Sequence, residues 1–91
     1  RSLTRYLKSS ERLAKNLIEQ ENWEEVIELC QTILAHDDCW EGAYRLLMTA
    51  YEGQGNRAQA LRTFESCKNT LSDKWGVDPM PETVEIYESI R

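Results

Sequence analysis

The segment Leu47-Met48-Thr49-Ala50-Tyr51, the turn Gly53-Gln54-Gly55-Asn56, and then Ala60 and Phe64 decide the fold of this 91-residue chain. Apolar residues recur there at steps of three and four on both sides of the turn, which is the spacing of two amphipathic helices. Glycine and asparagine in the turn end one helix and begin the next. We therefore predict a helical hairpin at this place.

The same pattern occurs 34 residues earlier in the chain. A shift by that distance needs no insertion and aligns Leu13 with Leu47, Leu17 with Tyr51, Asn22 with Asn56, Val26 with Ala60 and Cys30 with Phe64. A fixed period indicates stacked units, each of which covers the apolar face of its neighbour. We predict an all-α fold of antiparallel helix-turn-helix repeats in one domain over 1–91, with repeat 1 at about 7–38 and repeat 2 at about 41–75.

The periodicity predicts five helices and no strand. They are expected over residues 2–20, 23–36, 40–51, 57–75 and about 80–91. Asn22 is expected to cap the second helix and Asp37 or Asp38 the third, while Gly76 ends the fourth. Pro81 lies in the first turn of the C-terminal helix, whose inner side is expected to carry Val84, Tyr87 and Ile90. The expected buried stripe of the first helix consists of Leu3, Tyr6, Leu7, Leu13, Ala14, Leu17 and Ile18.

The charge of the chain is unevenly distributed. Residues 1–15 hold five basic residues and one acid, whereas residues 19–41 hold eight acids and neither Lys nor Arg. The net charge of −5 argues against direct binding of nucleic acid, which depends on neutralising phosphates. No apolar run approaches the roughly 20 residues that span a bilayer, and no secretion signal is recognisable. We expect a cytoplasmic protein with no membrane partner, in which Cys30, Cys39 and Cys67 are reduced.

The hairpin pattern resembles the tetratricopeptide repeat, which reads W-x2-L-G-x2-Y, then A-x3-F, then P. The second repeat matches better, because Tyr44, Leu47, Tyr51, Ala60 and Phe64 fill its aromatic, leucine, tyrosine and A-x3-F positions. Met48 replaces the small glycine, and no proline closes either unit. The resemblance implies that the first helix of each repeat lines a concave groove. It also implies marginal stability or a homodimer, since such stacks typically need three repeats.

From Glu41 onward the sequence is more specific than a generic repeat. It contains Arg45-Leu46-Leu47-Met48, Gly55-x-Arg57-x-x-Ala60-Leu61 and Gly76-Val77-Asp78-Pro79. Together these elements resemble the bacterial transcriptional activator domain of SARP-type regulators, over about 20–91. One departure is Trp75, where that family usually has leucine, and we expect it to fill a core site.

This second resemblance implies the regulatory and activating part of a transcription factor. In that family a winged-helix DNA-binding domain usually precedes this one. Since the chain begins at Arg1 without an initiator Met, we expect a segment that lacks its DNA reader. The implied partners are the winged-helix domain of the same chain, RNA polymerase or another subunit. A stand-alone adaptor of tetratricopeptide type, which binds an acidic peptide or protein, is the alternative.

The candidate partner-binding residues lie on the first helices of the two repeats. Lys8, Lys15 and Arg45 are predicted to form a cationic cluster suited to a carboxylate, with Arg12 and Thr49 beside it. For the basic face as a whole we favour the simpler interpretation, which is the solvated face of an amphipathic helix without a binding role. That face consists of Arg1, Arg5, Lys8, Arg12 and Lys15.

Catalytic, cofactor and metal sites are not expected. His36 and Cys39 with Asp37 or Asp38 have the ligand types for zinc, but a structural site needs four ligands and no second pair is suitably spaced. An ordinary interhelical turn explains them better. The chain has no Ser, His and Asp set and no phosphate-binding glycine loop with its lysine, so we predict that it is not an enzyme. Trp40 and Trp75 are expected to be packing residues rather than interface anchors.

Overall fold

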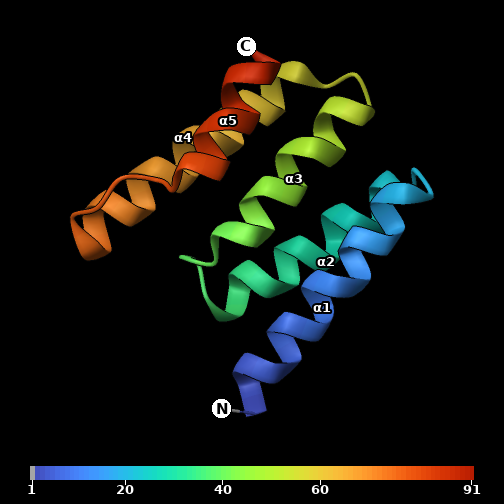
Figure 1. The fold of residues 1–91 in the computed structure, drawn as a ribbon, viewed down its shortest axis with the longest axis horizontal. Helices are drawn as coiled ribbons and strands as arrows, with labels where there is room; N and C mark the ends of the chain where they lie inside the picture. Colours follow the sequence, from blue (N-terminus) through green and yellow to red (C-terminus); the bar gives the residue numbers. More distant parts are fainter. Residues whose placement is uncertain (1) are drawn as a thin grey trace.

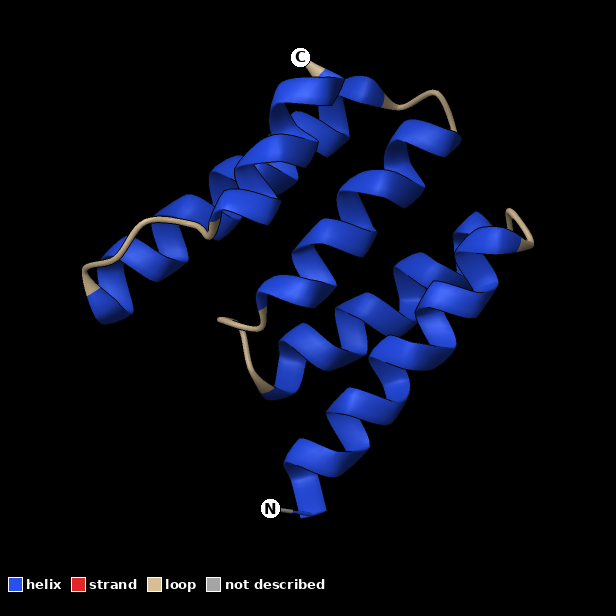
Figure 2. Ribbon diagram, viewed as in Figure 1, coloured by secondary structure: helices blue, strands red, loops and turns tan. Residues whose placement is uncertain are grey.

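The computed structural model describes residues 2–91 and contains five helices (Figures 1 and 2). They are α1 (Ser2–Glu19), α2 (Trp23–His36), α3 (Glu41–Gly53), α4 (Arg57–Trp75) and α5 (Pro81–Ile90). The described residues form no strand, so the prediction of an all-α chain is confirmed. The predicted helix limits agree with the observed ones to within two residues.

The helices form two layers. Consecutive helices pack on one another, and in addition α3 contacts both α1 and α5. In the described part of the chain the backbones of α2 and α4 make no close contact, so α1, α3 and α5 form one layer and α2 and α4 the other. Figure 1 shows α1, α3 and α5 following one another across the molecule, as the first helices of successive repeats do. The tetratricopeptide-like arrangement is therefore consistent with the observed packing.

The turns use asparagine and glycine as the sequence suggested, with one exception. The Asn56 side chain accepts a hydrogen bond from the Gln59 amide at 3.2 Å and caps α4. Gly76 ends α4 in the left-handed conformation at φ 64°, where a residue without Cβ is least strained. Asn22 precedes α2 but does not cap it, because its side-chain amide donates to Glu25 instead.

The expected capping of α3 by aspartate is wrong. Trp40 occupies the N-cap of α3, and its side chain makes no cap hydrogen bond. Asp37 accepts a hydrogen bond from the Cys39 amide at 3.1 Å within the loop, so its carboxylate is used to shape that loop. Asp38 lies in the same loop, where its backbone carbonyl accepts from the Tyr44 hydroxyl at 2.8 Å.

The core consists of three clusters that follow the stack. The first joins repeat 1 to α3 and is made of Leu7, Ala14, Val26, Cys30, Ile33, Ala43, Leu47 and Ala50. The second joins α3, α4 and α5 through Met48, Ala60, Phe64 and Ile90. The third holds Tyr44, Cys67 and Leu71 under the end of α2. Met48 is fully buried in the same cluster as Ala60. The generic repeat has a small glycine at the position of Met48, which lets the two helices cross more closely.

Part of the stripe expected to be buried on α1 is exposed. Leu3, Tyr6 and Leu13 have about half of their surface accessible, whereas Leu7 and Ala14 are buried. The reason is that, within residues 2–91, α1 packs only on α2 and α3, so its remaining flank has no neighbouring helix there. One repeat later, Leu47 is only 7% exposed because α2 covers the equivalent flank of α3.

Trp75 does not fill a core site, and the expectation that it packs inside is wrong. It is 69% exposed at the end of α4, and its indole N–H donates to the Cys39 sulfur at 3.1 Å. Gly76 turns the chain away directly after it, so no further helical turn covers the ring. Trp40, in contrast, is partly buried against the first core cluster.

α5 closes the stack as a first helix of a further repeat would. The Glu41 carboxylate on α3 accepts hydrogen bonds at the N-terminal end of α5, from the Met80 amide at 2.9 Å and the Thr83 hydroxyl at 2.8 Å. At the C-terminal end, Arg57 donates to the Ile90 carbonyl at 2.7 Å. Both ends of α5 are therefore attached to the second repeat.

The three thiols are expected to differ strongly in reactivity. Burial, together with a smaller effect of the nearby acids Glu11 and Glu41 respectively, raises the pKa of Cys30 and of Cys67 to about 12. Cys39 is only half-buried in the α2–α3 loop. Because the thiolate is the reactive form, we expect one equivalent of thiol to react rapidly with Ellman's reagent and two only after denaturation. Rapid reaction of all three in native protein would contradict this core.

Candidate functional site

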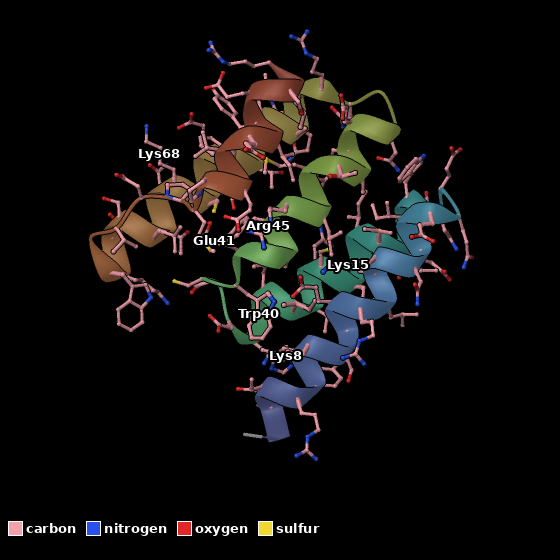
Figure 3. All side chains as sticks on the ribbon, in the orientation of Figure 1. Lys8, Lys15, Trp40, Glu41, Arg45 and Lys68 are labelled. Atoms are coloured by element: carbon pink, nitrogen blue, oxygen red, sulfur yellow. The ribbon has the colours of Figure 1, made fainter. Side chains whose placement is uncertain are left out.

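A groove lies on the layer formed by α1, α3 and α5. It has a volume of about 220 Å³ and is lined by Glu11, Lys15, Gly42, Arg45, Leu46, Thr49 and Ile86. Figure 3 shows Lys15 on α1 and Arg45 on α3 on the same side of the molecule, with Lys8 nearer the N-terminus of α1. Three of the five predicted binding residues, Lys15, Arg45 and Thr49, therefore line one groove. Lys15 and Thr49 are 34 residues apart in the sequence, which is one repeat period.

The other two predicted residues lie beside this groove rather than in it. Lys8 and Arg12 are exposed on α1 and line a shallower pocket together with Glu11 and Lys15. That pocket continues the basic face of α1 toward its N-terminus. Arg1, the first member of the predicted basic face, lies outside the described residues.

Arg45 and Thr49 are held by the fold. The Arg45 guanidinium donates to the Thr83 hydroxyl at 3.0 Å, and the Thr83 hydroxyl donates to the Glu41 carboxylate. Thr49 donates to the Arg45 carbonyl at 2.9 Å. A guanidinium carries five N–H donors, so one bond to Thr83 fixes its position without using up its capacity to bind an anion.

Glu11 is the groove residue whose role the sequence did not indicate. Its carboxylate accepts a hydrogen bond from the Trp40 indole N–H at 2.8 Å and lies 3.6 Å from the Lys15 ammonium. It also lies against Gly42, where a Cβ would meet the carboxylate. The groove that holds Lys15 and Arg45 of the predicted cationic cluster thus also contains an acid. The spacing of four between Glu11 and Lys15 was the available signal.

The residues with zinc-ligand chemistry are only partly brought together. Ligand atoms of Asp37, Asp38 and Cys39 lie within 4.8 Å of one another. The Asp38 carboxylate, however, is paired with the Lys74 ammonium at 3.0 Å. The His36 ring packs edge-on against the Tyr6 ring at a centroid distance of 5.9 Å and is not in this group. The loop geometry agrees with the interpretation as an interhelical turn.

A comparison with protein-family models decides the family. The model described as the bacterial transcriptional activator domain matches residues 1–91, which is the whole chain. The chain belongs to the bacterial transcriptional activator domain family. The match to the bacterial transcriptional activator domain includes α1, which precedes the region from about residue 20 that carried the sequence resemblance. This family is regulatory and is not a family of enzymes.

Two further comparisons add no relative, since no curated protein and no solved structure matches the chain significantly. In residues 2–91, none of the helices has the length and apolar character needed to cross a membrane.

Proposed function

We propose that this bacterial transcriptional activator domain is the non-catalytic, protein-binding part of a SARP-type regulator that works in the cytoplasm. It acts by holding an acidic surface of a partner in the groove on α1, α3 and α5. The observation that supports this proposal is the convergence of Lys15, Arg45 and Thr49 from two repeats on that groove. The partner is the winged-helix domain of the same regulator, RNA polymerase or another subunit.

The distribution of charge supports a protein partner over nucleic acid. The basic face of α1 is short and borders the groove, whereas the sequence from residue 19 to 41, which includes α2, holds eight acids and neither Lys nor Arg. A phosphate backbone that approached α1 closely would also face this acidic part. An acidic protein segment of limited length meets only the cations and leaves α2 in solvent.

The proposal is tested by binding to purified bacterial RNA polymerase and to a purified winged-helix domain of a SARP-type regulator. Wild-type protein is compared with the triple variant Lys8→Glu, Lys15→Glu, Arg45→Glu, whose fold is checked by circular dichroism. We expect wild-type protein to retain one of the two partners and the folded triple variant to lose at least tenfold in affinity, since several complementary charges are reversed. Equal retention by the two proteins would overturn the assignment of the groove.

One observation, the same cationic groove, also favours the adaptor function. A groove of this kind can bind an acidic partner without the help of a DNA-binding domain. The two functions differ in the partners they require. An adaptor binds short acidic peptides from unrelated proteins with similar affinity and does not discriminate in favour of polymerase or the winged-helix domain.

A homodimer remains a proposal for this domain. The exposed Leu3, Tyr6 and Leu13 on α1 are apolar surface of the kind that a second copy can cover. Thermal melting at several protein concentrations tests it, because the melting temperature of a dimer rises with concentration. A cooperative melt that does not depend on concentration would exclude the dimer.

A further inference from the structure

The groove already contains a carboxylate, and that carboxylate belongs to the protein. We infer that Glu11 is an internal competitor: its side chain occupies the place that a partner's carboxylate takes, so only strongly acidic segments enter the groove. This inference rests on the proposed function and adds the residue that determines its selectivity.

The environment of Glu11 is suited to a carboxylate. One oxygen accepts from the Trp40 indole N–H at 2.8 Å, and the other lies 3.6 Å from the Lys15 ammonium. Gly42 presents no side chain there, so the carboxylate lies directly against the α3 backbone. An N–H donor, a cation and an open helix surface are the features that an anion-binding site in a groove requires.

The Glu11 carboxylate can be displaced from this place. The side chain of Lys15 is 63% exposed and the pair is long, so solvent screens the attraction. Glu11 itself is 18% exposed, and its flexible side chain can rotate toward solvent along the basic face of α1, near Lys8 and Arg12. A partner carboxylate can then accept from the Trp40 indole and pair with Lys15 and Arg45.

The charges of the groove explain the selectivity. While Glu11 is in place, its negative charge offsets one of the two cations, Lys15 and Arg45, that line the groove. A singly charged segment replaces one carboxylate with another and gains little. A segment with several acids also meets Lys8 and Arg12 in the adjoining pocket, and this gain compensates for moving Glu11.

The experiment compares Glu11→Gln with Glu19→Gln. Both variants remove one negative charge from α1, but Glu19 is exposed and does not line the groove. The probe is an N-acetylated peptide of six glutamates, titrated into ¹⁵N-labelled protein at low ionic strength. Trp23, Trp40 and Trp75 give three indole N–H signals, of which only the Trp40 signal should shift with peptide.

We expect Glu11→Gln to lower the Kd for the peptide about threefold to fivefold, the range of a partly screened charge interaction. Glu19→Gln removes a charge that lies one helical turn from Lys15 but outside the groove, so it should lower the Kd less than Glu11→Gln does. An equal gain in both variants would mean that only net charge matters, and an unchanged Kd in Glu11→Gln would mean that Glu11 does not compete. Either result overturns the inference.

A third protein separates this inference from the proposed function. If the Lys8, Lys15 and Arg45 to Glu variant binds the peptide as wild type does, the groove is not the binding site and both proposals fail. If that variant loses binding while Glu11→Gln behaves as wild type, the groove function stands and the role of Glu11 alone is refuted. The Trp40→Phe variant, which lacks the indole donor, should bind the peptide more weakly if the partner carboxylate takes over that hydrogen bond.

Discussion

A Leu47→Ala variant is expected to lose about 2–5 kcal/mol of unfolding free energy, while the equivalent change in the first repeat, Leu13→Ala, costs about 0.5 kcal/mol or less. The two leucines occupy the same position of the 34-residue repeat. Leu47 is 7% exposed and belongs to the core that joins α2 to α3, whereas Leu13 is 51% exposed. Truncation therefore leaves a cavity at Leu47 and removes only surface contacts at Leu13.

Urea unfolding followed by circular dichroism measures this difference. A domain of this size typically has an unfolding free energy of about 5–10 kcal/mol, so Leu47→Ala should remove a large part of it. Equal losses in the two variants would show that α1 has a further neighbour that buries Leu13. In that case the flank of α1 would not be free in solution.

A Phe64→Ala variant is expected to lose about 3–5 kcal/mol, because a large aromatic side chain is removed from a closed core. Phe64 is 7% exposed and stacks on Tyr87 of α5, with ring centroids 4.0 Å apart and an interplanar angle of 16°. It also belongs to the cluster with Met48, Ala60 and Ile90. Its loss therefore weakens the attachment of α5 as well as the packing of α3 on α4.

The matched control is Phe64→Leu, which keeps most of the volume and should cost about 1.5 kcal/mol or less if neighbours repack. Combining Phe64→Ala with Tyr87→Ala gives a double-mutant cycle for the stacked pair, with an expected coupling of about 0.5–1.5 kcal/mol. A coupling of zero would indicate that α5 is not packed on α4 in solution.

The repeat made most of the fold predictable from the sequence. Apolar residues at steps of three and four defined the five helices, and the 34-residue period placed equivalent residues in equivalent layers. Local capping was less predictable, since Asn56 caps α4 while the equivalent Asn22 bonds to Glu25. Whether an asparagine side chain bonds to the backbone or to a neighbouring side chain depends on small differences in free energy, which a residue pattern does not reveal.

The predictions of burial were correct only at positions that a neighbouring helix covers. The periodicity of α1 marks Leu13 as apolar, but it does not state whether another helix covers that flank. Trp75 was misplaced for a related reason. An aromatic residue at the end of a helix is buried only if the chain continues over it, and Gly76 directs the chain away.

The candidate site was predicted in part for the same physical reason. The repeat register was sufficient to bring Lys15, Arg45 and Thr49 to one groove. It was not sufficient to show that Glu11 accepts a hydrogen bond from Trp40 or that Thr83 of α5 holds Arg45, because these contacts depend on side-chain conformations and on an element outside the two repeats.

The most direct test of the central claim, that this domain activates transcription through its groove, is a tethering experiment. The 91-residue chain is fused to a heterologous DNA-binding domain bound upstream of a weak promoter, and the transcript is measured in bacteria. We predict increased transcription with the wild-type chain and basal transcription with the folded Lys8, Lys15 and Arg45 to Glu variant at equal protein level. Transcription raised equally by the two fusions would contradict the account.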